Sequence, residues 1–65
     1  MNAIRQLRES HGLSQQVVAL ACGVTADTVG RWERSAQHVI PRHQRKLAKT
    51  LGVTIADLQL EDLVR

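Results

Sequence analysis

The sequence predicts a compact all-α domain built from five short helices. Its apolar residues recur at helical spacing along the whole chain, and no segment shows a convincing strand-like alternation. Capping residues and glycines divide this pattern into short segments. The length of 65 residues allows one domain over residues 1–65, with a small core that gains stability from packing against a second copy.

The first three helices are delimited by small polar residues and glycines. We expect the first helix over about residues 2–11, ended by Gly12. Ser14 is the expected N-cap of the second helix and Gly23 its C-terminal stop. Thr25 is the expected N-cap of the third helix.

The last two helices also have clear starts. Pro41 opens the fourth helix, because the missing N–H of proline costs nothing at the first helical position, and Gly52 ends it. Thr54, with Asp57 three residues later, resembles a capping box for a fifth helix. The positions expected to face the core, helix by helix, are Ile4, Leu7 and His11; Val18, Ala19 and Cys22; Val29 and Trp32; Leu47, Ala48 and Leu51; and Ile55 and Leu58.

Composition argues against several classes of protein. Cys22 is the only cysteine, which rules out an internal disulfide and suits a reducing cytosol. The histidines form no metal-ligand spacing with it, and no Ser/His/Asp set, glycine-rich phosphate loop or carboxylate pair is present. We therefore expect a protein that is not an enzyme and holds no cofactor or metal. No apolar run is long enough to span a bilayer, and no signal-peptide pattern opens the chain.

The formal charge of +3 is unevenly distributed. Residues 1–50 carry eight Lys or Arg against three acidic residues, whereas residues 51–65 carry one Arg against three acidic residues. A basic body with a mildly acidic tail indicates that one face meets a polyanionic partner. Ordinary solvated charge is the alternative, and charge alone does not separate the two.

The segment over about residues 14–34 has the spacing of a helix-turn-helix. The stretch "QQVVALACGVTADTVGRWER" joins two helices by three or four residues with a glycine inside, which allows a sharp bend between them. A glycine between helices is common, so the residues around the turn carry the stronger indication.

Two stretches, "LSQQVVALACGVTADTVGRWERS" and "LAKTLGVTIADL", give that wider pattern. Over about residues 4–60 the chain resembles the DNA-binding domain of the lambda-type repressor and Cro family, the xenobiotic-response-element-like group with a Cro/C1-type helix-turn-helix. The resemblance implies a lambda repressor-like fold whose third helix, about residues 25–34, is the recognition helix in the major groove. The departures from the family pattern are Ser35 in place of a frequent glycine, Val17 and Leu20 in place of usual polar residues, and Gly30 in place of a longer side chain.

The resemblance places Ala26, Asp27 and Arg31 of the third helix against DNA bases. Arg31 can donate two hydrogen bonds to guanine, Asp27 can accept one from a cytosine amino group, and Ala26 can contact a thymine methyl. The alternative for Asp27 and Arg31 is an i,i+4 surface ion pair, and the two roles combine if Asp27 holds Arg31 for its guanine. Gly30 is expected on the same outer face, where it lets the backbone approach DNA or gives Arg31 room to turn. Tolerated drift is the alternative for this glycine.

Contacts to DNA phosphates are also implied by the resemblance, and such contacts position a domain without specifying sequence. Gln15, at the start of the second helix, is expected to meet a phosphate with help from the helix N-terminal amides. Plain solvent exposure is the alternative for the loop residues. The other residues expected around the groove are Thr28, Arg34, Gln37, His38 and Arg42.

Three further residues are expected to have structural roles. Arg8 and Glu33 match a pair that links the first and third helices in some relatives, so the resemblance implies a structural ion pair. Trp32 lies at helical spacing from Val29, so we expect it in the core and not as a stacking platform. Cys22 is expected to behave as a small buried hydrophobic residue.

Together these features favour a regulator of transcription that binds specific sequences in double-stranded DNA, in the cytoplasm and on the nucleoid of a bacterial or phage system. We expect a Cro-like repressor without a small-molecule ligand, controlled by its own concentration and bound as a homodimer to an inverted-repeat operator. Leu60, Leu63 and Val64 either fold back onto the core or form the dimer interface, which we favour. The alternative is a protein-binding module on the same fold, an antitoxin or small phage-encoded inhibitor, that docks a partner through Val17 and Leu20.

Overall fold

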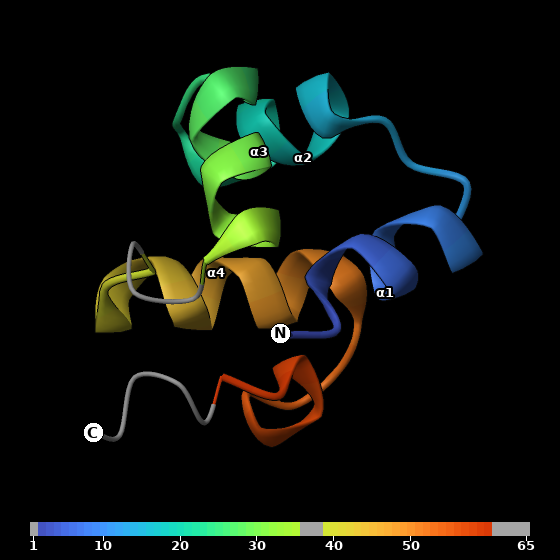
Figure 1. The fold of residues 1–65 in the computed structure, drawn as a ribbon, viewed down its shortest axis with the longest axis vertical. Helices are drawn as coiled ribbons and strands as arrows, with labels where there is room; N and C mark the ends of the chain where they lie inside the picture. The colour runs from blue at the N-terminus through green and yellow to red at the C-terminus, as the bar shows by residue number, and fades with distance from the viewer. Residues whose placement is uncertain (1, 36–38, 61–65) are drawn as a thin grey trace.

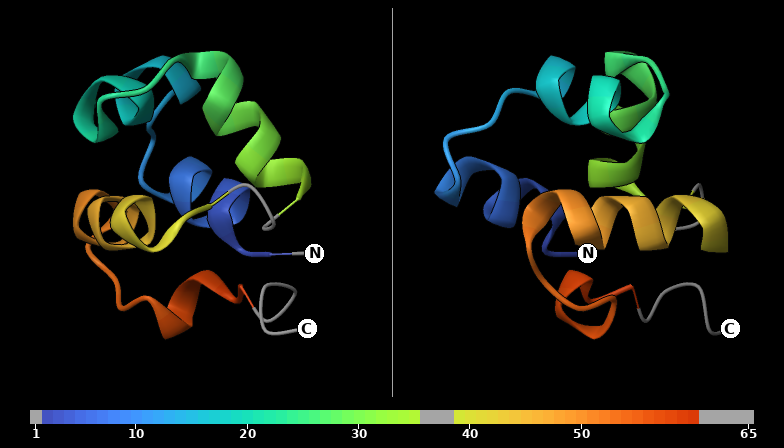
Figure 2. Two further views of the ribbon diagram at one scale, coloured as in Figure 1. Left: turned by 90° about the vertical axis from the view of Figure 1, so that its left-hand side faces the viewer. Right: turned by 180° about the vertical axis from the view of Figure 1, so that it is seen from behind.

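The computed structural model describes residues 2–35 and 39–60, and in these ranges it contains four α-helices and one short 3-10 helix. Helices α2 and α3 pack against each other on one side of α1 and α4, and η2 lies on the other side (Figure 1). The two further views show the same three levels (Figure 2). The elements are α1 Ile4–Ser10, α2 Gln15–Cys22, α3 Ala26–Arg34, α4 Pro41–Leu51 and η2 Ala56–Leu58.

The helix-turn-helix forms as predicted because its capping residues act locally. The Ser14 hydroxyl accepts a hydrogen bond from the backbone N–H of Val17 at 3.1 Å, and the Thr25 hydroxyl accepts one from Thr28 at 3.3 Å. Between the helices Gly23 has a φ of 76°, a left-handed conformation that costs other residues about 1–2 kcal/mol. The turn therefore depends on this glycine.

The core is aliphatic around a single indole. Trp32 is fully buried, and its ring centroid lies 5.2 Å from that of His43 on α4. The inward positions predicted for α2, α3 and α4 are all confirmed. The buried cluster consists of Ile4, Val18, Ala19, Cys22, Val29, Trp32, Val39, Leu47, Ala48, Leu51, Leu58 and Leu60.

The first helix is shorter than predicted. The side-chain oxygen of Asn2 accepts a hydrogen bond from the backbone N–H of Ile4 at 3.0 Å, while its amide donates to the Trp32 carbonyl at 2.8 Å. Asn2 thus ties the start of α1 to the end of α3 from outside the helix. The expectation that His11 faces the core is wrong, because His11 follows the last helical residue and is exposed.

The prediction of a fifth α-helix is also wrong, although its capping box forms. The backbone N–H of Thr54 donates to the Asp57 carboxylate at 3.1 Å, and the N–H of Asp57 donates to the Thr54 hydroxyl at 3.2 Å. Only one 3-10 turn follows, because Gln59 adopts a left-handed φ of 57°. That turn brings Leu58 and Leu60 into the core together, which a continuing helix cannot do for residues two apart.

The end of the chain bears on the expected dimer interface. Leu60 is only 8% exposed and belongs to the core of the single chain, so it folds back as in the first of the two alternatives. Ile55 was expected inward, yet it is 40% exposed. Leu63 and Val64 lie outside the described residues.

Within residues 2–35 and 39–60, no helix combines the length and the apolar character that crossing a membrane requires.

Candidate nucleic-acid interface

The outer face of α3 carries two of the three residues predicted to contact bases. Because Val29 and Trp32 are buried, Asp27 and Arg31 point away from the core, with side chains 78% and 61% exposed. Ala26 is half-buried and packs partly against the core, at the first position of the helix. The structure therefore presents one cation and one carboxylate on adjacent turns of an exposed helical face.

Asp27 and Arg31 interact with each other in the free protein. The Arg31 Nε lies 3.6 Å from a carboxylate oxygen of Asp27, so the predicted i,i+4 pair is present. An ion pair this exposed adds little stability, because water screens it and both side chains lose freedom. Arg31 has five N–H donors, and this contact engages only the Nε side of its guanidinium.

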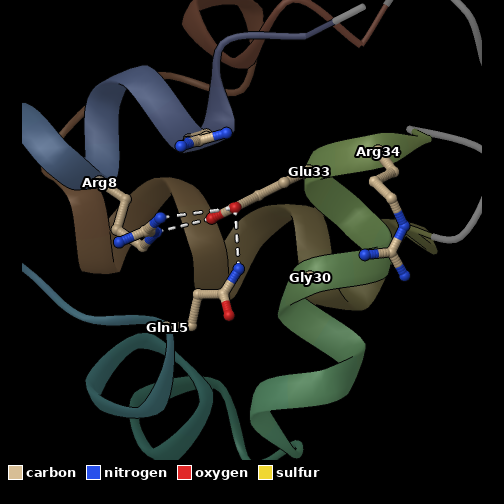
Figure 3. A pocket seen from close by; sticks show the side chains of 6 residues that line it. Arg8, Gln15, Gly30, Glu33 and Arg34 are labelled. Carbon is tan, nitrogen blue, oxygen red and sulfur yellow. Dashed lines mark hydrogen bonds and ion pairs between the residues drawn. The ribbon is translucent and has the colours of Figure 1, made fainter.

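Behind this face, a buried network joins the first three helices. The Arg8 Nε donates to the Glu33 Oε2 at 2.6 Å, and its Nη1 donates to the Leu13 carbonyl at 2.8 Å. These side chains are only 11% and 6% exposed, and the predicted ion pair between α1 and α3 is confirmed. The amide nitrogen of Gln15 donates to the Glu33 Oε1 at 3.0 Å (Figure 3).

Sequence reasoning missed the bond between Gln15 and Glu33. A signal was present, because Glu33 stands four residues after the inward-facing Val29 on α3. A carboxylate on the buried side of a helix needs several donors to offset its lost hydration, and one arginine leaves an oxygen lone pair unused. Gln15 is the polar residue that the turn brings within reach.

Gly30 does not lie on the outer face as predicted. It is buried, and a Cβ placed on it would lie 3.6 Å from both the Gln15 Nε2 and an Arg34 Nη. These two side chains lie on either side of the glycine (Figure 3). Gly30 therefore lies between these two side chains, on the flank of α3 that faces the start of α2.

A cleft of about 390 Å³ opens over this glycine. Its charged lining is three arginines and one glutamate, and that glutamate is Glu33, already paired with Arg8. At the rim, the hydrogen bond and charge of Glu9 raise the pKa of the Arg5 guanidinium above its ordinary value. The cleft is lined by Arg5, Arg8, Gln15, Gly30, Glu33 and Arg34.

The other residues predicted to contact phosphates are dispersed. Thr28 is half-buried, and its hydroxyl lies 3.0 Å from that of Thr25 within the N-terminal cap of α3. Arg42 is exposed in the first turn of α4. Gln37 and His38 lie outside the described residues.

Two large apolar side chains are exposed on α2. Val17 is 48% exposed and Leu20 is 76% exposed, whereas Val18 and Ala19 on the opposite side of the helix are buried. Single exposed apolar residues are normal on protein surfaces, but these two are three apart and share a helical face.

Cys22 has the environment of a core residue. It is 1% exposed, its Sγ lies 4.0 Å from the Thr50 hydroxyl, and burial raises the pKa of its thiol above the ordinary value. A raised thiol pKa disfavours the nucleophilic thiolate. Among the described side chains, His, Cys, Asp and Glu form no group of three that would hold a metal ion.

Residues 4–58 match the model of a helix-turn-helix family, HTH_3, whose members are of the Cro/C1 type. The chain belongs to this family. The resemblance to the lambda-type repressor and Cro group is thereby confirmed, and the family is one of non-enzymatic DNA-binding domains that regulate transcription. Comparisons with curated proteins and with solved structures gave no match.

Proposed function

We propose that this Cro/C1-type domain is a sequence-specific repressor that binds an inverted-repeat operator as a homodimer. The observation that carries the proposal is the exposed pair Asp27 and Arg31 on α3, next to the arginine-lined cleft at the start of α2. A groove-contacting face and a phosphate-contacting cleft on adjoining helices are what specific DNA binding needs.

In this proposal α3 lies in the major groove and its exposed side chains contact base edges. Arg31 donates two hydrogen bonds to the O6 and N7 of a guanine, and Asp27 accepts from a neighbouring cytosine amino group or holds Arg31 in place. The methyl group of Ala26 contacts a thymine methyl. The 3.6 Å contact between Asp27 and Arg31 supports the shared role, because it restricts the arginine before DNA arrives.

Phosphate contacts position α3 in the groove. Gln15 and Arg34 meet the DNA backbone at the cleft, and Arg42 adds a contact from α4. Thr28, Gln37 and His38 complete the proposed set.

The dimer is proposed from symmetry and size. Two recognition helices related by a two-fold axis enter successive major grooves about 34 Å apart. The domain is 30 Å along its longest axis, so one copy fits one half-site. Because Leu60 is buried in its own chain, Leu63 and Val64 are the two of the three expected interface residues that we still propose to pair across the axis. A dimer on a promoter-proximal operator blocks RNA polymerase.

Selection of binding sites from random duplex DNA tests this function. We expect recovered sites with two inverted half-sites spaced by about one helical turn. The affinity for the selected site should fall steeply as salt rises, since each neutralised phosphate releases counterions. Absence of binding to any duplex at low salt would contradict the proposal.

A second candidate function is a protein-binding module, favoured by the exposure of Val17 and Leu20. The variant Val17→Thr with Leu20→Gln removes the apolar pair without changing charge. If DNA binding is the whole function, operator affinity in solution and repression of a reporter gene both stay at the wild-type level. Lost repression with unchanged operator affinity would instead show that the pair docks a protein. Gln16→Ala, on the same helix, is the matched control.

A further inference from the structure

We propose that Glu33 is a positioning residue for DNA binding: it orients the Gln15 amide toward the phosphate that, in the proposed function, meets Gln15 and Arg34 at the cleft over Gly30. This inference rests on the proposed DNA contact and deepens it. It gives Glu33, which faces the interior and not the groove, a role in binding.

The contact with Glu33 determines which way the Gln15 amide points. An amide carries a donating NH2 group and an accepting oxygen, and only the NH2 group can face a carboxylate. The 3.0 Å bond from the Gln15 Nε2 to the Glu33 Oε1 therefore fixes the nitrogen toward Glu33, which lines the cleft together with Gln15. One of its two N–H groups is used by Glu33, and the second is left for an anion.

Arg8 in turn fixes the carboxylate of Glu33. Its Nε holds the Glu33 Oε2 at 2.6 Å and its Nη2 lies 3.5 Å from the Oε1, so the carboxylate has one orientation available. A third bond, from the Arg8 Nη1 to the Leu13 carbonyl, anchors the guanidinium to the segment just before α2. The chain of contacts runs from α1 through α3 to the first residue of α2 (Figure 3).

The glycine leaves room between two donors. The Gln15 Nε2 and an Arg34 Nη both lie 3.6 Å from the point where a Cβ would stand on Gly30. A methyl group there would be in ordinary contact with both nitrogens and would not disturb the free protein. It would, however, occupy the space in which an anionic oxygen can accept from both.

The charges of the cleft favour a phosphate group over a neutral ligand. Arg34 carries positive charge at its rim together with Arg5, which is paired with Glu9, and the Glu33 carboxylate in the lining is already satisfied by Arg8 and Gln15. Hydrogen bonds from amide and guanidinium groups to an anionic oxygen are stronger than those between neutral groups. The contact involves the DNA backbone, so it is independent of base sequence.

A double-mutant cycle tests the positioning role. The first change is Gln15→Ala, and the second replaces the ion pair as a unit, Arg8→Met with Glu33→Met, which leaves net charge unchanged. Apolar replacement of a whole buried pair is often neutral or stabilising, so this background is expected to fold. The readout is the affinity for random duplex at fixed salt, with Gln16→Ala as the control for changes at the start of α2.

We expect Gln15→Ala to lower the affinity about tenfold in the wild-type background, the loss of one hydrogen bond to a charged group. In the background without Glu33 the same change should cost much less, because the amide is no longer oriented. An equal loss in both backgrounds would overturn the positioning role while leaving the proposed function intact. A wild-type protein that binds no duplex would overturn both.

Gly30→Ala tests the phosphate position in a protein whose fold is not at risk. Alanine favours the helix, so the melting temperature should stay level or rise. The affinity should fall by a similar factor for operator and random duplex, because a backbone contact is lost. Undiminished affinity in the Gly30→Ala protein would overturn the placement of a phosphate over Gly30.

Discussion

Replacing Arg8 with alanine is expected to lower the free energy of unfolding by about 3–5 kcal/mol, the usual cost of breaking one side of a buried ion pair. The change leaves the Glu33 carboxylate, only 6% exposed, with Gln15 as its remaining partner. It also frees the Leu13 carbonyl, which accepts from Arg8 at 2.8 Å. Small domains have a total stability near the low end of 5–15 kcal/mol, so a large fraction of the variant should be unfolded at 37 °C.

Urea unfolding followed by far-ultraviolet circular dichroism measures this loss. Arg5→Ala is the matched control, because it also removes an arginine from α1 and an ion pair to a glutamate. The pair between Arg5 and Glu9 is exposed, with side chains 71% and 54% accessible, so its removal should change stability far less. Similar midpoints for the two variants would contradict a structural role for the buried pair.

Replacing Arg31 with alanine is expected to weaken operator binding by about 1–3 kcal/mol and to relax the preference at one base-pair position of each half-site. The physical reason is the loss of two hydrogen bonds to a guanine edge, which no other base offers in the same geometry. Folding should be unaffected, since the Arg31 side chain is 61% exposed and its one ion pair lies on the surface.

The measurement compares affinities for the selected operator, for single-base variants of it and for random duplex. Arg45→Ala, an exposed arginine on α4, is the control for the loss of one positive charge. It should lower affinity slightly and equally for every duplex. An equal loss on operator and random duplex for Arg31→Ala would show that Arg31 contacts a phosphate and not a base.

Features governed by neighbouring residues were predictable from the sequence. The caps Ser14 and Thr25 and the turn glycine Gly23 define α2 and α3 within a few residues of one another, and each acts as expected. The outward-facing positions Asp27 and Arg31 follow from the same helical periodicity, because the inward face of α3 is marked by Val29.

Predictions that depended on contacts distant in sequence were less complete. Periodicity placed Gly30 on the outer face of α3, but Gln15 and Arg34 cover it, and only the packing of α2 beside α3 brings Gln15 there. A capping box predicted a fifth helix, but the burial of both Leu58 and Leu60 favours a 3-10 turn with a left-handed residue after it. In both cases the deciding contact depends on how the packed elements meet, so a pattern of neighbouring residues does not reveal it.

Local sequence patterns are enough to predict the helix-turn-helix, its core positions and the two side chains on α3 that face outward. These follow from caps, glycines and helical spacing, which act within a few residues. The packing of the helices is needed to show that Glu33 binds Gln15 as well as Arg8, and that Gly30 leaves a cleft between Gln15 and Arg34. Those arrangements join three helices, and the partner of a buried carboxylate is set by which donors the packed helices bring within hydrogen-bonding distance.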